Sequence, residues 1–337
     1  FSTVQYAGTA MGIKLANIEN QSLQWETTRR MNLGFDVQAF NNRVRLSGDV
    51  YHNNTNNLLT LDKVPYLTGL QYYWCNGGSL VNNGASVNLT VRAINKKDWK
   101  WEVGASAGTY KNKITKLPTG TNFKNGKDEL YGFTTDIYNG TVLSAEGMAA
   151  GVFYGYATDG VYKDAADALV DGKPVETYDV NTGLVTQFEA GDVKFVDQDG
   201  NNFIDENDRV VIGNPNPALF GNIQSSLKYK NFTLSATLNY SLGNDVYNYQ
   251  RSLLESGSNF YNQTVAVVNR WKAEGDVTDM PRATYGDPKG NNRFSDRWIE
   301  DGSYLRLKDL TLSYQVPVSA SWLQGLTVWA SGTNLLT

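Results

Sequence analysis

An acidic segment near the middle of the chain has the residue types and spacing to bind a cation. Residues 197–208 read DQDGNNFIDEND, with oxygen-bearing side chains at alternating positions. Ca²⁺ takes about six to eight oxygen ligands, and a calcium-binding loop supplies them at positions 1, 3, 5, 7, 9 and 12. The residues at these positions are Asp197, Asp199, Asn201, Phe203 (through its backbone carbonyl), Asp205 and Asp208. The spacing therefore predicts a calcium site.

Two positions depart from the usual calcium loop. Asn202 stands at position 6, where glycine is usual, but asparagine tolerates the left-handed backbone conformation. Asp208 stands at position 12 in place of the longer glutamate. The alternative interpretation is a turn rich in Asp and Asn, whose side chains only cap backbone N–H groups.

Two groups of aromatic residues are candidate substrate contacts. Tyr72, Tyr73 and Trp74 fall in one expected long loop, and Tyr154 and Tyr156 fall in another. Aromatic rings in such loops could stack on sugar rings or on peptide side chains. The alternative is that these rings pack locally inside large ordered loops.

We predict no catalytic residues and no enzymatic activity. The chain has one histidine, His52, and one cysteine, Cys75, which argues against His-dependent catalysis, zinc binding and an intrachain disulfide. A pair such as Glu300 and Asp301 could serve glycoside hydrolysis. However, the chain has 34 Asp and Glu residues, so neighbouring carboxylates are expected by chance.

The composition favours strands and loops. The 337 residues include 20 Tyr, 13 Phe, 8 Trp and 32 Gly. No apolar run approaches the roughly 20 residues of a membrane-spanning helix, a measure that detects barrel strands poorly. The net charge is −4 and there is no basic run, so nucleic acid is not expected as a partner.

Four hairpins with alternating apolar and polar residues are predicted, over 25–52, 85–113, 221–241 and 304–335. In the third hairpin a two-residue turn at Lys230–Asn231 sets Tyr229 opposite Phe232 and Leu227 opposite Leu234, so one side is apolar throughout. From Phe232 to Tyr240 the strand is long enough to rise about 21 Å at a tilt of about 40°. That height is close to the apolar band of an outer-membrane barrel, about 25 Å.

The connections alternate between short and long. The turns inside the hairpins are short, whereas the connections between hairpins, 55–84, 114–219 and 242–302, are long. Outer-membrane barrels have this asymmetry, with short periplasmic turns and long extracellular loops. The pattern favours a barrel over its rival, a soluble or surface-attached β-sandwich that binds glycans. Loops this long further indicate a sector of a larger barrel.

Several segments, spread over nearly the whole chain, resemble one family. They are NQSLQWETTRRMNLGFDV (20–37), FYGYATDGVY (153–162), GDVKFVDQDGNNFIDENDRVVIGNPNP (191–217), LKYKNFTLS (227–235) and SDRWIEDGSYLRLKDLTLSYQVP (295–317). Together they resemble the C-terminal barrel portion of SusC-like, TonB-dependent outer-membrane transporters of Bacteroidetes. The acidic segment departs slightly from the family's usual form, since Asn201 and Asn202 replace Asp and Gly.

The resemblance implies an all-β fold, a sector of about eight strands from a 22-stranded antiparallel transmembrane barrel. It implies an N-terminal plug and TonB box, neither of which is expected within residues 1–337, and coupling to the TonB–ExbB–ExbD motor. It also implies a SusD-like surface lipoprotein as a lid, outer-membrane lipid around the barrel, and oligosaccharides or peptides as substrates. Residues 114–219 are expected to form an ordered extracellular subdomain.

Overall fold

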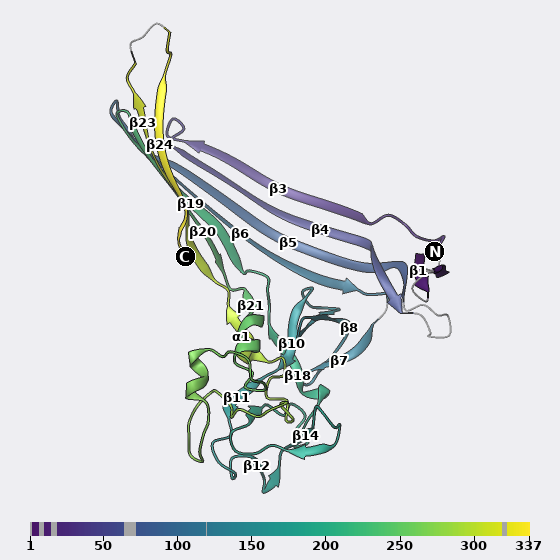
Figure 1. Ribbon diagram of the computed structural model, residues 1–337. Coiled ribbons are helices and arrows are strands. Elements are labelled where there is room, and N and C mark those ends of the chain that lie inside the picture. The colour runs from purple at the N-terminus through teal and green to yellow at the C-terminus, as the bar shows by residue number, and fades with distance from the viewer. Residues whose placement is uncertain (1, 7–9, 15–18, 64–71, 119, 319–321) are drawn as a thin grey trace.

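The computed structural model describes residues 2–6, 10–14, 19–63, 72–118, 120–318 and 322–337. Its main feature is one curved sheet of eight antiparallel strands in the order β24-β23-β20-β19-β6-β5-β4-β3 (Figure 1). These strands are β3 (Thr27–Ala39), β4 (Val44–Lys63), β5 (Tyr72–Asn95), β6 (Trp99–Lys116), β19 (Leu219–Tyr229), β20 (Phe232–Leu242), β23 (Tyr304–Val316) and β24 (Leu326–Leu336). A separate two-stranded sheet joins β1 (Ser2–Tyr6) and β2 (Ala10–Lys14).

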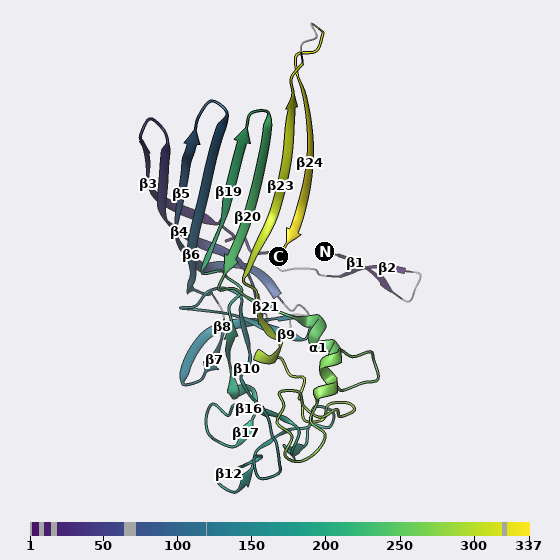
Figure 2. The ribbon, with the colours of Figure 1, turned by 90° about the vertical axis from the view of Figure 1, so that its left-hand side faces the viewer.

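The eight strands are the four predicted hairpins, laid side by side in chain order. In the third hairpin Tyr229 lies opposite Phe232 and Leu227 opposite Leu234, as the sequence predicts. Lys230 in the turn between them has φ of 49°, the left-handed conformation that a two-residue turn needs. The short turns of the first three hairpins lie together at one end of the sheet, where β23 also ends and β24 begins, and the connections 117–218 and 243–303 lie at the other end (Figure 2).

One side of the sheet is apolar and exposed. Leu33 and Phe35 of β3 are 76% and 53% exposed, and Leu89 of β5 and Leu234 of β20 are 40% and 41% exposed. In a water-soluble sandwich such a face would be covered by a second sheet. Here the large apolar side chains of four hairpins share one uncovered surface.

The first predicted loop, 55–84, is wrong. Most of it belongs to β4 and β5, which extend the hairpin as far as the Lys63–Tyr72 pair. The alternation of apolar and polar residues is lost there for two reasons. The stretch is rich in asparagine, and the register shifts between Thr55 and Leu59 reverse the phase of the side chains. The tip of this hairpin, 64–71, lies outside the described residues.

The two long connections, 117–218 and 243–303, fold together into what we call the loop unit (Figures 1 and 2). Five strands form its larger sheet: β7 (Thr121–Asn125), β8 (Asp128–Ile137), β9 (Gly140–Ala145), β10 (Val152–Tyr156) and β18 (Arg209–Gly213). The first connection also holds β11 (Thr158–Val161), β12 (Leu169–Val170), β13 (Lys173–Pro174), β14 (Glu176–Tyr178), β15 (Val185–Gln187), β16 (Val193–Phe195), β17 (Phe203–Ile204) and η2 (Glu206–Asp208). The second holds β21 (Asp245–Tyr247), α1 (Tyr249–Leu254), η3 (Val265–Asn269), η4 (Asp296–Trp298) and β22 (Ile299–Asp301).

The loop unit has its own core. One cluster of buried side chains includes Tyr162, Phe188, Val193 and Ile204, and a second is built on Leu143, Val152 and Tyr154. The second connection reaches this core through Phe294, which packs edge-on against Phe153 with ring centroids 6.3 Å apart. Within the described residues, no helix is both long and apolar enough to cross a membrane.

Candidate functional site

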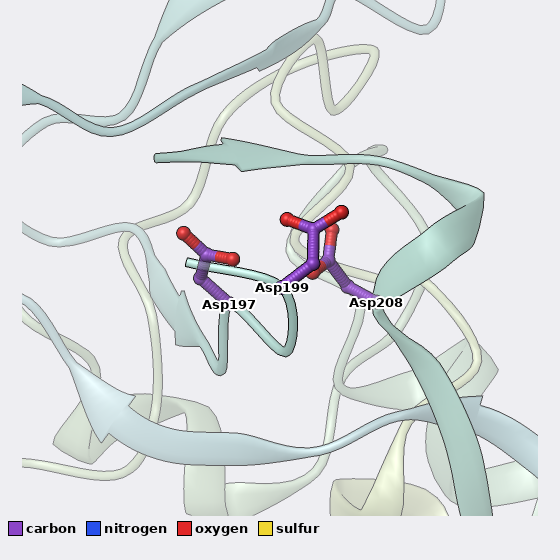
Figure 3. Close-up of side chains that lie close together, drawn as sticks. All are labelled: Asp197, Asp199 and Asp208. Atoms are coloured by element: carbon purple, nitrogen blue, oxygen red, sulfur yellow. The ribbon is translucent and has the colours of Figure 1, made fainter. Parts of the chain in front are cut away.

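The acidic segment, 197–208, follows β16 as a tight turn and then contains β17 and η2. Three of the predicted ligands, Asp197, Asp199 and Asp208, each bring a carboxylate oxygen to within 4.8 Å of the other two (Figure 3). They are positions 1, 3 and 12 of the predicted calcium loop. The fold therefore brings the two ends of the segment together, as a cation site requires.

The other predicted ligands are engaged with the backbone or the sheet. The side-chain oxygen of Asn201 accepts a hydrogen bond from the backbone N–H of Phe203 at 2.6 Å. Asp205 is the N-cap of η2 and accepts from the N–H of Asn207 at 2.6 Å. Phe203 itself lies in β17, paired with Glu176 of β14. Asp205 is not part of the carboxylate cluster.

The backbone of the loop has the predicted left-handed residue. Asn202 has φ of 63°, in the region that asparagine tolerates better than most residues. The chain turns back there, so that the N–H groups of Gly200 and Asn202 both point at Asp197 and donate to its carboxylate at 2.7 and 2.6 Å. This capping is the alternative role that the sequence left open for these carboxylates.

The electrostatics of the cluster favour a cation. The Asp208 side chain is fully buried, and burial raises the pKa of its carboxyl, with the nearby Asp197 and Asp199 acting in the same direction. Two backbone N–H groups, of Asp205 and Gln198, partly offset this rise in pKa. The nearest basic group is Lys124 of β7, whose ammonium is 3.9 Å from Asp199. Three hard oxygen donors suit a divalent cation, and the carboxylates of Asp197 and Asp208 keep spare lone pairs beside their hydrogen bonds from the backbone.

The first group of aromatic candidates is not in a loop. Tyr72, Tyr73 and Trp74 begin β5, where they pair with Lys63, Asp62 and Leu61 of β4. Trp74 is 42% exposed and its carbonyl accepts a hydrogen bond from the side chain of Asn20 at 3.0 Å. The side chain of Tyr72 lies outside the described part of the structure.

The second group is in the core of the loop unit. Tyr154 is 2% exposed, and its hydroxyl donates to the backbone carbonyl of Lys124 at 2.6 Å. Burial raises the pKa of this hydroxyl to about 12. Tyr156 is 7% exposed, and the guanidinium groups of Arg209 and Arg293 lie 5.6 and 5.4 Å from the centre of its ring. Both rings pack inside the unit, so contact with a ligand would require the core to open.

Sequence reasoning missed the polar contacts that lock the two connections together. The buried Asp192 accepts two hydrogen bonds from Arg282, at 2.9 and 3.1 Å, and one from the side chain of Asn291 at 3.0 Å. Arg282 also reaches Glu189 at 2.9 Å. These partners are about 90 positions apart in the chain, and no local pattern marks them.

A shallow depression of about 390 Å³ lies on the polar side of the eight-stranded sheet. Ser86, Asn88, Ser106, Asn222, Phe220 and Tyr304 are among the residues that line it. None of the described residues lining it is charged. Amides, hydroxyls and aromatic faces suit a neutral polar ligand. The regular Asn and Ser residues on the polar side of the strands were the signal for it in the sequence.

Comparison with known proteins gives the family. The family model for the TonB-dependent receptor-like β-barrel matches residues 3–187. TonB-dependent receptor P3 of Formosa agariphila is 34% identical over 332 residues, which are 97% of this chain and 31% of that protein. TonB-dependent receptor SusC of Bacteroides thetaiotaomicron is 30% identical over 302 residues, 88% of this chain and 26% of that protein.

Solved structures agree on the fold. The structure of the RagAB peptide transporter superimposes with a TM-score of 0.74 at 24% identity, over 99% of this chain and 34% of that one. The same importer in its closed-closed state gives a TM-score of 0.76. The chain thus spans about a third of the length of the curated relatives named first, and those relatives are named as receptors and not as enzymes. From the sheet, its exposed apolar side and these matches, the chain belongs to the TonB-dependent receptor-like β-barrel family, as an all-β part of the barrel that resembles SusC.

Proposed function

We propose that this chain forms part of the wall of a TonB-dependent importer in the outer membrane. The observation that carries the proposal is the two-sided sheet of eight antiparallel strands in a chain of this family. Its apolar side would contact lipid, and its polar side would line the lumen. Import would draw on the TonB–ExbB–ExbD motor through the N-terminal part of the intact protein.

The proposed orientation follows from the two ends of the sheet. The short turns, including Lys230–Asn231, would face the periplasm, with Tyr229 and Phe232 in the inner aromatic girdle. The loop unit would be extracellular, so residues 117–218 and 243–303 would make one ordered subdomain outside the cell; the first and last residues of the predicted range 114–219 belong to β6 and β19. Its hydrogen-bonded core supports this part of the proposal.

A SusD-like lipoprotein is the proposed partner of the loop unit. The second connection exposes several large apolar side chains: Phe260 at 92%, Val265 at 85%, Tyr261 at 79% and Tyr285 at 75%. Phe260 and Tyr285 stack with ring centroids 5.3 Å apart. Large apolar side chains exposed to this degree, two of them in contact, are typical of a protein interface. The relative named SusC and the RagAB structures support a partner of this class.

The proposed substrates are oligosaccharides or peptides. The neutral depression lined by Phe220, Asn222 and Tyr304 could hold either a sugar ring or a peptide backbone. RagAB, whose structure shares this fold, is a peptide transporter. That likeness supports peptides as one of the two classes for this chain.

We further propose that Ca²⁺ binds at Asp197, Asp199 and Asp208 and stiffens the loop unit. When bound, the ion would offset most of the negative charge of the three carboxylates and compensate for the burial of Asp208. The carbonyl of Phe203, with the side chains of Asn201 and Asp205, remains a predicted source of further ligands.

Uptake by cells tests the proposal. In the native host, the gene for the intact protein is deleted, and depletion of an oligosaccharide mixture and a peptide mixture from the medium is followed by mass spectrometry. We expect at least one mixture to persist in the deletion strain, and in wild-type cells treated with a proton ionophore. Complementation should restore depletion. Equal depletion of both mixtures by the two strains would contradict import.

Surface labelling tests the orientation and the rival β-sandwich. In a Cys75→Ser background, Leu184→Cys and Asn231→Cys are treated with a membrane-impermeant maleimide on intact cells. Leu184 is 69% exposed in the first connection and is not among the residues proposed to contact the lipoprotein. We expect labelling of residue 184 alone, with residue 231 labelled only after lysis. Labelling of both positions on intact cells, or release of the protein without detergent, would favour the sandwich.

A further inference from the structure

The apolar side of the sheet carries charged side chains of one sign only. In the regular part of β3–β6, β19 and β20, the register places four Asp, Glu, Lys, Arg or His side chains on that side, and all four are basic. They are Arg29 of β3, His52 of β4, and Lys111 and Lys113 of β6.

The polar side of the same strands has charges of both signs. Glu102 and Arg92 form an ion pair there at 3.1 Å. Asp49 accepts a hydrogen bond from Ser86 on that side, and Lys100 and Lys228 lie opposite each other. The chain as a whole has more acidic than basic residues. Its composition therefore does not explain why the charged side chains on the apolar side are all basic.

The basic residues lie at the loop end of the apolar band. Along β6 the apolar side reads Trp99, Trp101, Val103, Ala105, Ala107, Thr109, and then Lys111 and Lys113. Lys111 is twelve residues beyond Trp99, which is about 31 Å along the barrel axis at a strand tilt of about 40°. The apolar band of such barrels is about 25 Å tall. The lysines therefore lie just past the hydrocarbon, at the level of lipid headgroups.

The residues also lie next to one another. Asn83 of β5 lies directly opposite both His52 and Lys111. The His52 imidazole Nδ1 is 2.6 Å from the Asn83 side-chain oxygen. Lys113 is the next side chain on the same side of β6, and all of these side chains are exposed. Among the described residues, Arg29, Lys111 and Lys113 have no carboxylate partner.

We infer that Lys111 and Lys113, with His52 and Asn83 beside them, bind a phosphate-bearing lipid headgroup of the outward leaflet. Ammonium groups without acidic partners at headgroup level attract anionic lipid, and phosphate oxygens accept charge-assisted hydrogen bonds from lysine. Arg29 extends the positive surface across β3. The inference rests on the outer-membrane placement in the proposed function, but it does not depend on import.

Native mass spectrometry of the full-length, delipidated protein in detergent tests the inference, with diphosphoryl lipid A as the probe. We expect the double variant Lys111→Gln/Lys113→Gln to weaken lipid A binding about tenfold or more. The matched control is Lys100→Gln/Lys228→Gln, which removes two lysines from the polar side and should change binding less than about twofold. Lys111→Arg/Lys113→Arg keeps the charge and should retain binding.

Equal affinity of the two glutamine variants for lipid A would overturn the inference, whether both bind as wild type or both are weakened. If the Lys111→Gln/Lys113→Gln variant does not fold, the dependence of lipid A binding on ionic strength is measured with the wild-type protein instead. Binding should fall steeply between low and high ionic strength and should be competed by inorganic phosphate. Salt-independent binding would overturn it. If a variant that no longer binds lipid A still imports normally, the lipid site and the import function are separate. If the deletion strain shows no uptake defect while the protein still binds lipid A, only the proposed import function is contradicted.

Discussion

The carboxylate of Asp296 binds Thr158 twice, although 138 positions of chain separate them. The Thr158 hydroxyl donates to Oδ1 at 2.6 Å, and its backbone N–H donates to Oδ2 at 3.0 Å. Close by, Tyr156 and Ser295 form an isolated parallel bridge, and the N–H of Tyr156 donates to the carbonyl of Phe294 at 3.0 Å. The two long connections are thus held together by hydrogen bonds at the edge of a shared core.

Replacing Asp296 with alanine should loosen both connections at once. The change leaves the partly buried N–H and hydroxyl of Thr158 without their partner, at a cost of about 1–3 kcal/mol to the loop unit. Hydrogen–deuterium exchange of the full-length protein in detergent should show faster exchange around 152–162 as well as around 294–298. Asp276→Ala is the matched control, because Asp276 is exposed and caps only Lys272 and Ala273 in its own connection. Faster exchange confined to 294–298 would argue against coupling.

The stability of the loop unit should fall as the pH rises from about 4 to about 6. Burial raises the pKa of the Asp287 carboxyl to about 6, although hydrogen bonds from the N–H groups of Asn291 and Asn292 oppose the rise. In this pH window the folded unit holds a proton that the unfolded chain has lost, so protonation stabilises folding. The loss on complete deprotonation is on the order of 3 kcal/mol.

The Asp287→Asn variant should flatten this pH dependence. Asparagine cannot ionise, and its oxygen can still accept a hydrogen bond. Asp208, whose pKa is also raised by burial, should leave a smaller slope in the same direction. Exchange rates of the loop unit at pH 4.5, 5.5 and 7, corrected for intrinsic exchange, would measure the effect. An unaltered slope in the variant would show that Asp287 is not responsible.

Removing calcium should destabilise residues 193–211 if the acidic loop holds the ion. A ligand present at about 100 times its dissociation constant stabilises the folded state by roughly 2.7 kcal/mol. A calcium chelator should therefore speed exchange in this segment, and added Ca²⁺ should reverse it. Asp199→Asn should abolish the response, while Asp301→Asn, at an exposed turn that caps Ser303, should keep it. If chelator has no effect on wild type, the carboxylates act only as backbone caps.

A charge placed in the middle of the apolar side should be costly. Ala236 lies on the apolar side of β20, four residues from Phe232 and four from Tyr240. Arginine at the midplane on the lipid side of a barrel costs about 2–4 kcal/mol. Ala236→Arg should lower the urea midpoint of the protein in lipid vesicles. Thr237→Arg, next in sequence on the polar side, should be close to neutral. A similar loss for both variants would contradict the assignment of the sides.

The sequence was sufficient for the wall and insufficient for the loop unit. Alternation along Phe232–Tyr240 predicts a two-sided strand because one side meets an apolar environment and the other does not. Where β4 and β5 run on past Thr55 and Leu80, asparagines replace the apolar residues and the register shifts, so the pattern that defines a strand disappears. The strands persist there through backbone pairing and polar side-chain contacts, such as the hydrogen bond from the Asn76 side chain to the carbonyl of Asn57 at 2.8 Å.

The loop unit shows what residue spacing can predict and what it cannot. The meeting of Asp197 with Asp208 followed from the loop pattern, because the turn at Asn202 is encoded locally. The burial of Tyr154 and Tyr156 did not, because Tyr154 packs against Phe123 and Tyr156 lies against Arg209 and Arg293, which arrive from elsewhere in the chain. Contacts between residues far apart in the chain produce no repeating pattern of apolar and polar residues, so a single sequence does not reveal them.

The pairing of Asp192 with Arg282 sets a rule for exchanging parts between relatives. A chimaera that took residues 117–218 from another member of the family and kept 243–303 would place two independently evolved surfaces in one core. Arg282 would stay, while the residue opposite it would come from the other protein. A donor without an acidic side chain at that position would leave the partly buried guanidinium without its carboxylate, a costly arrangement. The two connections therefore form one structural module that is encoded in two separate segments of the gene. Grafting experiments should transfer both segments together.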